Sequence, residues 1–303
     1  MAQTATTGNL ANVQRIIINA ARFVQEYKAP SWQLIDKVSL PRGASTVRIP
    51  KVGQFVISEL QDGQDMTDEQ SIGLTSIDLT TSEKGAKIVI SDKLTRQNGT
   101  TDIFSIIGRQ FGEAGARKQD RDVQALYSGL NSGTAFGAAG SSMGLSRYAG
   151  AIAVAKGGGK AAGSSGQETG TEPFDPTYAI VHPHTAFDVV RSATAIGAGT
   201  SMRVNDRREE KMLQNFYKIS FNGVDLFESG NIDIDSSGDM IGVIAQRDAL
   251  IGITSVGWTT ERQRDASARG TEVNFTSDYD VFEQDNEHGA PLLYDATAPG
   301  TSS

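Results

Sequence analysis

The stretch Lys84–Leu130 limits what this chain can fold into more than any other part of the sequence. Ala86, Ile88 and Ile90 recur at every second position, which is typical of a β-strand. The polar residues that follow carry a turn signal and a helix-start signal, and no proline occurs after them until Pro173. The stretch is therefore predicted to be a strand that leads into one long helix.

The apolar residues of this helix change side half-way along it. Ile107 and Phe111 belong to one stripe, whereas Val123 and Tyr127 project to roughly the opposite side at about 100° per residue. No single core can bury both halves of a straight helix, so two different parts of the structure should touch it. The alternative is a break near Gly112 that produces two ordinary core helices.

Three glycines, Gly108, Gly112 and Gly115, project to nearly the same side as the second stripe. Each glycine costs about 1 kcal/mol relative to alanine in a helix interior. Their presence on one side suggests that something approaches the helix backbone closely there.

The N-terminal part of the chain predicts an amphipathic helix that ends near Ala29-Pro30. Its apolar stripe includes Leu10, Val13, Ile17 and Val24. The helix can pack on its own domain, or it can be an arm that lies on a neighbouring subunit. The sequence lacks a signal-peptide pattern and a run of eighteen apolar residues, so we expect a soluble protein that is not exported and does not contact a membrane.

Residues 40–90 predict a long β-hairpin, because alternating apolar stretches flank the polar sequence DGQDMTDEQ. Such a charged tip is usually a solvated turn, but it could also reach a basic surface on another copy of the chain. The acidic residues of the tip are Asp62, Asp65, Asp68 and Glu69. The basic candidates on the long helix are Arg109, Arg117, Lys118 and Arg121.

The segment 131–171 is rich in glycine, alanine and serine. With so few large apolar side chains it cannot offset its own ordering entropy unless it packs on something else, so we expect a loop with one short ordered piece at Leu145–Val154. Beyond it, Tyr178–Val181 predicts a strand, Thr185–Arg191 a helix and Asn222-Gly223 a tight hairpin turn. Further strands are expected at 240–254 with a kink at Arg247-Asp248, and at 256–264, 271–282 and 289–294.

The motifs that could carry chemistry each lack a required part. Gly140–Gly144 fits the G-x-S-x-G pattern around Ser142, but no apolar strand precedes it as a hydrolase requires. Gly157–Lys160 lacks the first glycine and the hydroxyl residue of a phosphate-binding loop. Asp233–Gly238 resembles the start of a calcium loop, but Ile244 stands where a carboxylate is needed. A polar turn is the expected structure there, with a loosely held calcium ion as the alternative.

The remaining metal and nucleophile chemistry is equally limited. His182 and His184 have the spacing of two metal ligands, but the proline between them and the lack of a third ligand nearby favour a structural turn. The chain has no cysteine, which excludes disulfides and thiolate sites. Its net charge of -8 opposes general nucleic-acid binding. We therefore expect no enzyme, no cofactor and no metal site.

Taken in order, the segments resemble the major capsid proteins of tailed bacteriophages of the Hong Kong 97 type. The resemblance covers roughly residues 5–297 and depends on the order of an amphipathic arm, a long hairpin, KIVISDKL, a long helix carrying DRDVQAL, YAIVHPHTAF, NGVDLFES and long C-terminal strands. It implies an α+β fold with an N-terminal arm, an extended β-hairpin loop, a peripheral domain built on a long spine helix, and an axial domain.

The resemblance also implies where these parts lie. They are the arm at 1–39, the hairpin loop at 40–90, the peripheral domain with the spine helix and the Gly/Ser-rich loop at 91–172, the axial domain at 173–254, and peripheral-domain strands with the C-terminal tail at 255–303. The implied function is a major capsid protein that self-assembles into pentamers and hexamers and forms an icosahedral shell around phage DNA. Its implied location is the virion, after assembly in the host cytoplasm.

On this view, subunits would meet through the arm, the acidic tip and the long helix, where the glycines let a neighbour come close. The candidate interface residues are Leu10, Val13, Ile17, Val24, Asp62, Asp65, Asp68, Glu69, Gly108, Gly112, Gly115, Arg109, Arg117 and Arg121.

The implied partners are other copies of the chain, a portal protein and a scaffolding protein, with or without a decoration protein. A separate scaffold or earlier cleavage is expected because the arm begins almost at once. No motif assigns the lysine-asparagine crosslink of some family members, so no crosslink is expected. Two alternatives stay open: an encapsulin-like nanocompartment shell protein with the same fold, and a structural subunit of a phage tail or adhesin.

Overall fold

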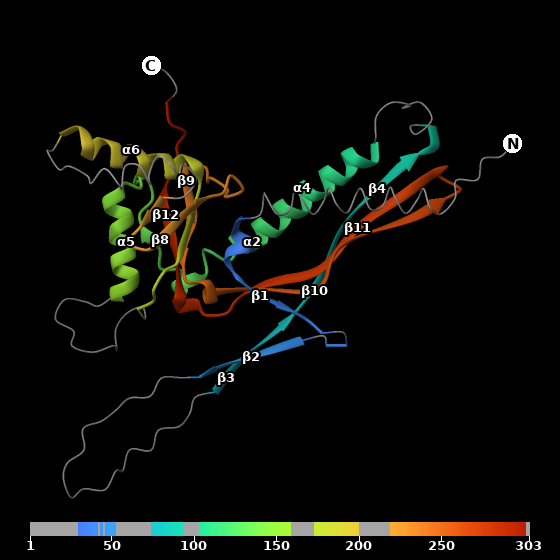
Figure 1. Ribbon diagram of the computed structural model, residues 1–303, viewed down its shortest axis with the longest axis horizontal. Coiled ribbons are helices and arrows are strands. Elements are labelled where there is room, and N and C mark those ends of the chain that lie inside the picture. Colours follow the sequence, from blue (N-terminus) through green and yellow to red (C-terminus); the bar gives the residue numbers. More distant parts are fainter. Residues whose placement is uncertain are drawn as a thin grey trace, which may run out of the picture.

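The computed structural model describes residues 30–41, 43–44, 46–52, 74–93, 103–158, 173–199 and 219–300. These residues form a mixed helix and sheet structure with an elongated outline (Figure 1). A six-stranded sheet with helices α5 and α6 lies at one end, and long strands with helix α4 extend to the other end. A separate two-stranded hairpin projects from the region between them.

The first sheet has four strands in the order β1 (Asp36–Ser39), β10 (Leu250–Asp265), β11 (Gly270–Glu283) and β4 (Ser82–Ser91). Strands β10 and β11 form a long antiparallel ribbon, β4 adds to β11 in antiparallel orientation, and β1 adds to β10 in parallel. The register shifts twice between Thr254 and Thr259, which increases the local twist of the ribbon. The long strand pair and the strand around Ile88 are therefore confirmed.

Helix α4 (Ile103–Gln124) runs without a break past Gly112, so the alternative of two shorter helices is wrong. Ile107 and Phe111 pack with residues of β4 and β11 in one apolar cluster. Val123 and Tyr127, at the far end of the helix and in the turns just after it, are fully buried in a second and larger cluster. The predicted change of face is confirmed, because the two halves of one straight helix serve two cores.

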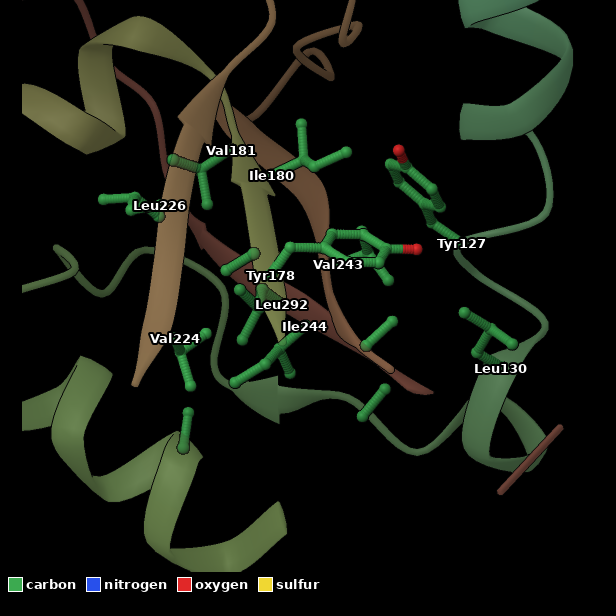
Figure 2. Packing of buried hydrophobic residues seen from close by; sticks show 14 of the residues in the cluster. Tyr127, Leu130, Tyr178, Ile180, Val181, Val224, Leu226, Val243, Ile244 and Leu292 are labelled. Atoms are coloured by element: carbon green, nitrogen blue, oxygen red, sulfur yellow. The ribbon is translucent and has the colours of Figure 1, made fainter. Parts of the chain in front are cut away.

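The second sheet has six strands in the order β5 (Phe136–Gly137), β12 (Gly289–Asp295), β9 (Asp239–Ala245), β6 (Tyr178–Val181), β8 (Val224–Glu228) and β7 (Ile219–Phe221). Its strands contribute a large share of the larger core, and Tyr127 and Leu130 approach that core from the α4 side (Figure 2). Helices α5 (Leu145–Gly157) and α6 (Pro183–Gly199) lie beside this sheet. At the turn between β7 and β8, Asn222 and Gly223 have φ angles of 51° and 87°, as the predicted tight hairpin requires.

Short helical elements complete the architecture. Helix α2 (Pro30–Leu34) packs on α4, and η1 (Leu130–Gly133) follows the long helix. The predicted kink at Arg247-Asp248 is the 3-10 helix η2 (Arg247–Ala249), where the chain passes from β9 of one sheet to β10 of the other. Helix η3 (Asn286–His288) marks the return crossing from β11 to β12.

Two of the expected segment boundaries need correction. We expected 91–172 to lie with the long helix, but α5 places Tyr148 and Ile152 in the core of the six-stranded sheet, and β5 pairs with β12. We also expected 255–303 to stay with the long strands, but β12 pairs with β9. Local patterns predicted β12 and an ordered piece at Leu145–Val154 but not β5, and they did not show which sheet would receive these elements, because that depends on contacts between residues far apart in the chain.

Candidate assembly interface

The base of the projecting hairpin consists of β2 (Thr46–Val52) and β3 (Leu74–Thr80), paired antiparallel from Thr46↔Thr80 to Val52↔Leu74. One face carries alternating apolar residues, as predicted, and packs on the start of β10. Leu79 is only 1% exposed in this cluster, which joins the hairpin base to Ile251 and Ile253. The predicted hairpin is therefore confirmed at its base, and its root is held by a small core of its own.

On the exposed face of the hairpin base, Arg48 and Asp78 form a bidentate ion pair. The Nε–Oδ1 distance is 2.6 Å and the Nη2–Oδ2 distance is 2.9 Å. The side-chain hydrogen bond lowers the pKa of Asp78 and raises that of Arg48. Because the two residues sit opposite each other on β2 and β3, the pair fixes the register of the strands rather than their attachment to the body.

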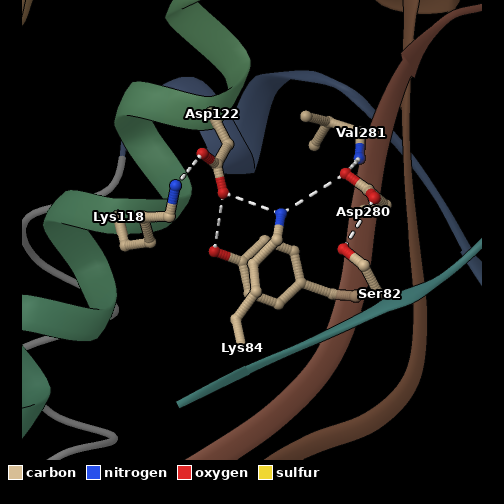
Figure 3. A network of polar contacts seen from close by, with 7 residues as sticks. Ser82, Lys84, Lys118, Asp122, Asp280 and Val281 are labelled. Carbon is tan, nitrogen blue, oxygen red and sulfur yellow. Dashed lines mark hydrogen bonds and ion pairs between the residues drawn. The ribbon is translucent and has the colours of Figure 1, made fainter. Parts of the chain in front are cut away.

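Lys84 ties the root of the hairpin to the long helix (Figure 3). It lies near the start of β4, directly after the hairpin, and its Nζ is 2.9 Å from Asp122 Oδ2 of α4 and 3.3 Å from Asp280 Oδ1 of β11. The ammonium also lies 4.3 Å from the ring centroid of Tyr279, whose hydroxyl donates to Asp122 at 3.0 Å. Strand β4, helix α4 and strand β11, which are distant in the sequence, thus meet at the partly buried ammonium group of Lys84.

The pKa of Asp122 reflects this cluster. Burial alone would raise it, but hydrogen bonds from Lys118, Lys84 and Tyr279 outweigh burial and lower it. A carboxyl whose pKa is lowered on folding stabilises the native state above its unfolded value of about 4, and this stabilisation is lost as the pH falls through the lowered value. The link between helix and hairpin root should therefore be fully formed at neutral pH.

Replacing Lys84 with methionine should lower the free energy of unfolding by about 1–3 kcal/mol at pH 7, since hydrogen bonds between charged groups are lost while the stem still packs. The difference in unfolding free energy between Lys84→Met and the parent protein should become smaller in acid, as Asp122 becomes protonated. The control is Lys118→Met, which removes an exposed i,i+4 pair to the same carboxylate and should cost only about 0.3–0.5 kcal/mol. Urea titrations at pH 7 and in acid measure both; equal losses at pH 7 would contradict the assignment.

Asp120 links helix α4 both to α2 and to the six-stranded sheet. This carboxylate of α4 is fully buried, at 0% exposure, and accepts four hydrogen bonds. One comes from the backbone N–H of Ser31 at 3.1 Å and one from Gln124 Nε2 at 2.8 Å. The others come from the segment after β8 of the six-stranded sheet, from Ser229 Oγ at 2.7 Å and Asn231 Nδ2 at 2.8 Å. A buried anion with this many donors fixes α4 against both α2 and the second sheet.

The outward face of α4 carries the predicted basic residues. Arg109 and Arg117 are exposed and meet no carboxylate among the described residues, and Ile106 beside them is 47% exposed. Arg121 already has a partner in its own chain, since its Nη2 is 2.7 Å from Asp233 Oδ1. Of the three arginines, Arg109 and Arg117 therefore offer the more available positive charge.

The three helix glycines are buried, but the structure corrects what approaches them at Gly115. A Cβ atom there would lie 3.2 Å from Phe275 Cε1 and 3.2 Å from Trp258 Cε2. These rings stack at a centroid distance of 4.5 Å, so the close neighbour is the chain's own sheet rather than another subunit. Gly108 and Gly112 are also buried, and their proposed role at an interface stays a prediction.

Gly115→Val should destabilise the protein by about 1–3 kcal/mol, because the added methyl groups would press into the stacked rings. Gly150→Ala is the matched control. Gly150 lies inside α5, and a Cβ atom added to it would have nothing within 4 Å, so alanine should stabilise the helix by up to about 1 kcal/mol. Thermal unfolding measures the melting temperatures of both variants. A Gly115→Val protein more stable than the parent would show that the stacked rings move aside at little cost in free energy.

Two groups of predicted interface residues lie outside the described part of the chain. They are Leu10, Val13, Ile17 and Val24 of the arm, and Asp62, Asp65, Asp68 and Glu69 of the hairpin tip.

Several of the motifs considered for chemistry make structural contacts, whereas Gly159 and Lys160 of the phosphate-loop-like sequence lie outside the described residues. Ser142 is exposed, and its backbone carbonyl accepts a hydrogen bond from Arg147 at 2.6 Å. Asp235 accepts the backbone N–H groups of Ser237 and Asp239, each at 2.8 Å, so the calcium-like sequence forms a polar turn. Within the described ranges, no three His, Asp or Glu side chains come together in a metal-binding arrangement. None of the described helices combines the length and apolar character needed to cross a bilayer.

The two neighbouring histidines hold the turn that leads into α6. His182 Nδ1 accepts the backbone N–H of His184 at 3.2 Å, and His184 Nδ1 lies 3.0 Å from the carbonyl of Ala296. Burial, with a smaller effect from His184, lowers the pKa of His182. The rings thus join the start of the helix to the end of β12.

Sequence reasoning missed the polar junctions at Lys84 and Asp120. A signal for Asp120 was available, because Ala116, Asp120, Val123 and Tyr127 follow helical spacing and therefore share one face. A carboxylate in the middle of an otherwise apolar face calls for a polar partner on another element. No comparable signal marks Lys84, which lies in a strand where alternate lysines are common on solvent faces.

A family model described as phage capsid protein matches residues 75–286, which is more than half of the chain. No curated protein matches the chain.

Several solved structures are similar over nearly the whole chain. A structure from Mycobacterium phage Che8 has a TM-score of 0.63 at 15% identity, covering 90% of this chain and 93% of that one. The head structure of Helicobacter pylori bacteriophage KHP40 has a TM-score of 0.64 at 11% identity, covering 86% and 87%. The SrpI encapsulin complex from Synechococcus elongatus has a TM-score of 0.57 at 11% identity, covering 90% and 91%. At these identities the likeness shows a shared fold.

Proposed function

Because this chain belongs to the phage capsid protein family, we propose that it is the major capsid protein of a tailed phage, which self-assembles into pentamers and hexamers of an icosahedral shell around DNA. The fold shared with the head structure of Helicobacter pylori bacteriophage KHP40 supports a shell protein. Identical chains that meet through heterologous contacts form closed rings when the rotation between neighbours closes.

The observation that carries this proposal is the projecting hairpin. Strands β2 and β3 pair only with each other among the described strands, and they leave the body from a compact root (Figure 1). A two-stranded hairpin is at best marginally stable alone in water, so one that projects from the body gains most from a surface supplied by another molecule. A second copy of the chain is the partner proposed for it.

The architecture suggests how the parts divide between roles. We assign α4 as the spine helix and the four-stranded sheet as the peripheral domain, and the six-stranded sheet with α5 and α6 as the axial domain. On this assignment β5, α5 and β12 belong to the axial part, in place of the boundaries expected from sequence. The arm residues, the acidic hairpin tip, Arg109 and Arg117 remain the proposed contacts between subunits, and the net charge of -8 suits a wall that does not grip its contents.

Electron microscopy of the purified protein at high concentration tests the proposal. Closed spherical particles are expected, and rods or fibres would favour a tail or adhesin subunit instead. A protein that stays monomeric at every concentration would count against any shell function.

The encapsulin-like alternative has one specific support, since the SrpI encapsulin complex shares the fold. Neighbouring genes separate the two functions, because portal and terminase genes beside this one would decide for a phage. The portal, scaffolding and decoration partners, the virion location and assembly in the host cytoplasm belong to the phage proposal and stand or fall with it.

A further inference from the structure

The hairpin base touches the body at a second point, just beyond its apolar root. Lys51, near the end of β2, extends its Nζ to within 2.9 Å of Asp285 Oδ1, a residue 234 positions away in the sequence. Asp285 lies just before η3, where the chain crosses from the four-stranded to the six-stranded sheet. The contact therefore links the outer part of the hairpin base to the junction between the two sheets.

Asp285 is a fixed acceptor. Its carboxylate caps η3 by accepting the backbone N–H of Glu287 at 3.2 Å, and its side chain is only 18% exposed. His288 Nδ1 lies 3.9 Å from its second oxygen and 3.0 Å from Asp248 Oδ2. Burial would raise the pKa of Asp285, but the hydrogen bonds from Lys51 and Glu287 with the nearby His288 lower it. The carboxylate is thus held in place and ionised, and Lys51 on the hairpin docks against it.

The position of Lys51 beyond the root lets this contact control the angle between the hairpin and the body. The apolar root extends along the hairpin as far as the cross-strand pair of Ile49 and Ile77, and Lys51 lies two residues farther along β2. At about 3.3 Å per residue this is about 7 Å beyond the root, so a displacement of about 2 Å at Lys51 would turn the hairpin by about 17°. Lys51 and Val52 end the described part of β2, so any such turn changes the direction in which this strand leaves the body.

We propose that the Lys51–Asp285 ion pair sets the direction in which the hairpin leaves the body, and through that direction the geometry of the assembled shell. The apolar cluster around Leu79 holds the root of the hairpin in place, and the ion pair limits rotation of the hairpin about that root. The second part of this statement rests on the proposed shell function, whereas the first part concerns the single chain alone. A closed assembly needs one fixed rotation between neighbours, so a hairpin free to turn would no longer specify a single closure.

The first test uses the unassembled protein. The chain has no cysteine, so Ser76→Cys on β3 and Ser128→Cys after α4 introduce two unique and exposed labelling sites. Spin labels at these sites report the distance between hairpin and body. Lys51→Met and Asp285→Asn should broaden or shift the distance distribution, and asparagine retains the cap of η3. Lys51→Arg should preserve the original distribution, because it keeps the charge and the reach.

The matched control is Lys87→Met. Lys87 forms an ion pair of similar length, 2.7 Å, with Glu272, but it lies within the four-stranded sheet and away from the hairpin. Its removal changes the net charge equally and should leave the distance distribution unchanged. A Lys51→Met distribution that matches those of the parent protein and Lys87→Met would overturn the inference, whatever the assembly results.

The second test compares assembled particles by electron microscopy. Lys51→Met and Asp285→Asn should lose the single size class of the parent protein, giving several diameters or open sheets, while Lys51→Arg and Lys87→Met keep it. Particles of unchanged diameter in all four variants would refute the link to shell geometry. If the parent protein itself forms no shells, the proposed function fails, and the distance measurement still decides the role of Lys51.

Discussion

Asp120→Ala is expected to lower the free energy of unfolding by about 3–5 kcal/mol, because it leaves several buried donors without an acceptor. The groups affected are the Ser31 N–H, Gln124, Ser229 and Asn231, all within 3.1 Å of the lost oxygens. For a chain of this size the loss corresponds to a drop in melting temperature of about 10 °C. Urea and thermal unfolding of dilute, unassembled protein measure the effect.

Two further variants sharpen this experiment. Asp120→Asn keeps the shape but turns an NH2 group toward other donors, so its cost should be about 1.5–3 kcal/mol. Asp233→Ala removes an aspartate whose side chain is 84% exposed and whose partner is Arg121, and should cost at most about 1 kcal/mol. A decrease of less than about 1 kcal/mol in the free energy of unfolding for Asp120→Ala would show that the donors find water or other acceptors. In that case this carboxylate does not fix α4 against α2 and the six-stranded sheet.

Removing the segment between β2 and β3 should abolish shells while leaving the subunit folded. The variant deletes residues 53–73 and joins Val52 to Leu74 through Asn-Gly, which suits these directly opposed strand ends. The apolar root around Leu79 stays intact, so the unfolding free energy should hardly change. If the hairpin supplies about 3 kcal/mol of subunit contact, the concentration needed for assembly should rise by about 100-fold.

The control for this deletion is a loop at a different place in the chain. Removing residues 161–170 shortens the Gly/Ser-rich segment between α5 and β6, whose two ends already meet where the Phe174 N–H donates to the Ala155 carbonyl at 2.9 Å. Assembly should survive this change, since loop shortening costs little when the ends are close. Light scattering against protein concentration follows both variants. Normal shells from the hairpin deletion would remove the main support for the proposed function.

Much of the fold could be predicted because its signals are local. The alternation at Ala86, Ile88 and Ile90 identified β4, and Asn222-Gly223 located the turn between β7 and β8. The shift of apolar residues from Ile107 to Val123 predicted that α4 serves two cores. Each inference used residues only a few positions apart, where backbone preference and the period of the element govern the outcome.

The polar junctions could not be predicted in the same way. Lys84 meets Asp280 across 196 positions, Ser31 meets Asp120 across 89, and Lys51 meets Asp285 across 234. In the sequence these residues look like ordinary surface charges, or like a single polar residue in a helix. Their partners come close only after the sheets have formed, so the candidate interface predicted from the apolar arm, the helix glycines and the charged residues contained none of these contacts.

By itself, the sequence determined most of the strands, the long helix, the tight turn and the presence of a hairpin, because periodicity and turn chemistry act between near neighbours. Only the tertiary structure decided that α5 and β12 join the six-stranded sheet, that the chain's own rings cover Gly115, and that Lys51 and Lys84 hold the hairpin at two points. The physical reason is that pairing and packing depend on the summed fit of surfaces distant in the chain, and no short stretch of sequence contains both of the surfaces that meet.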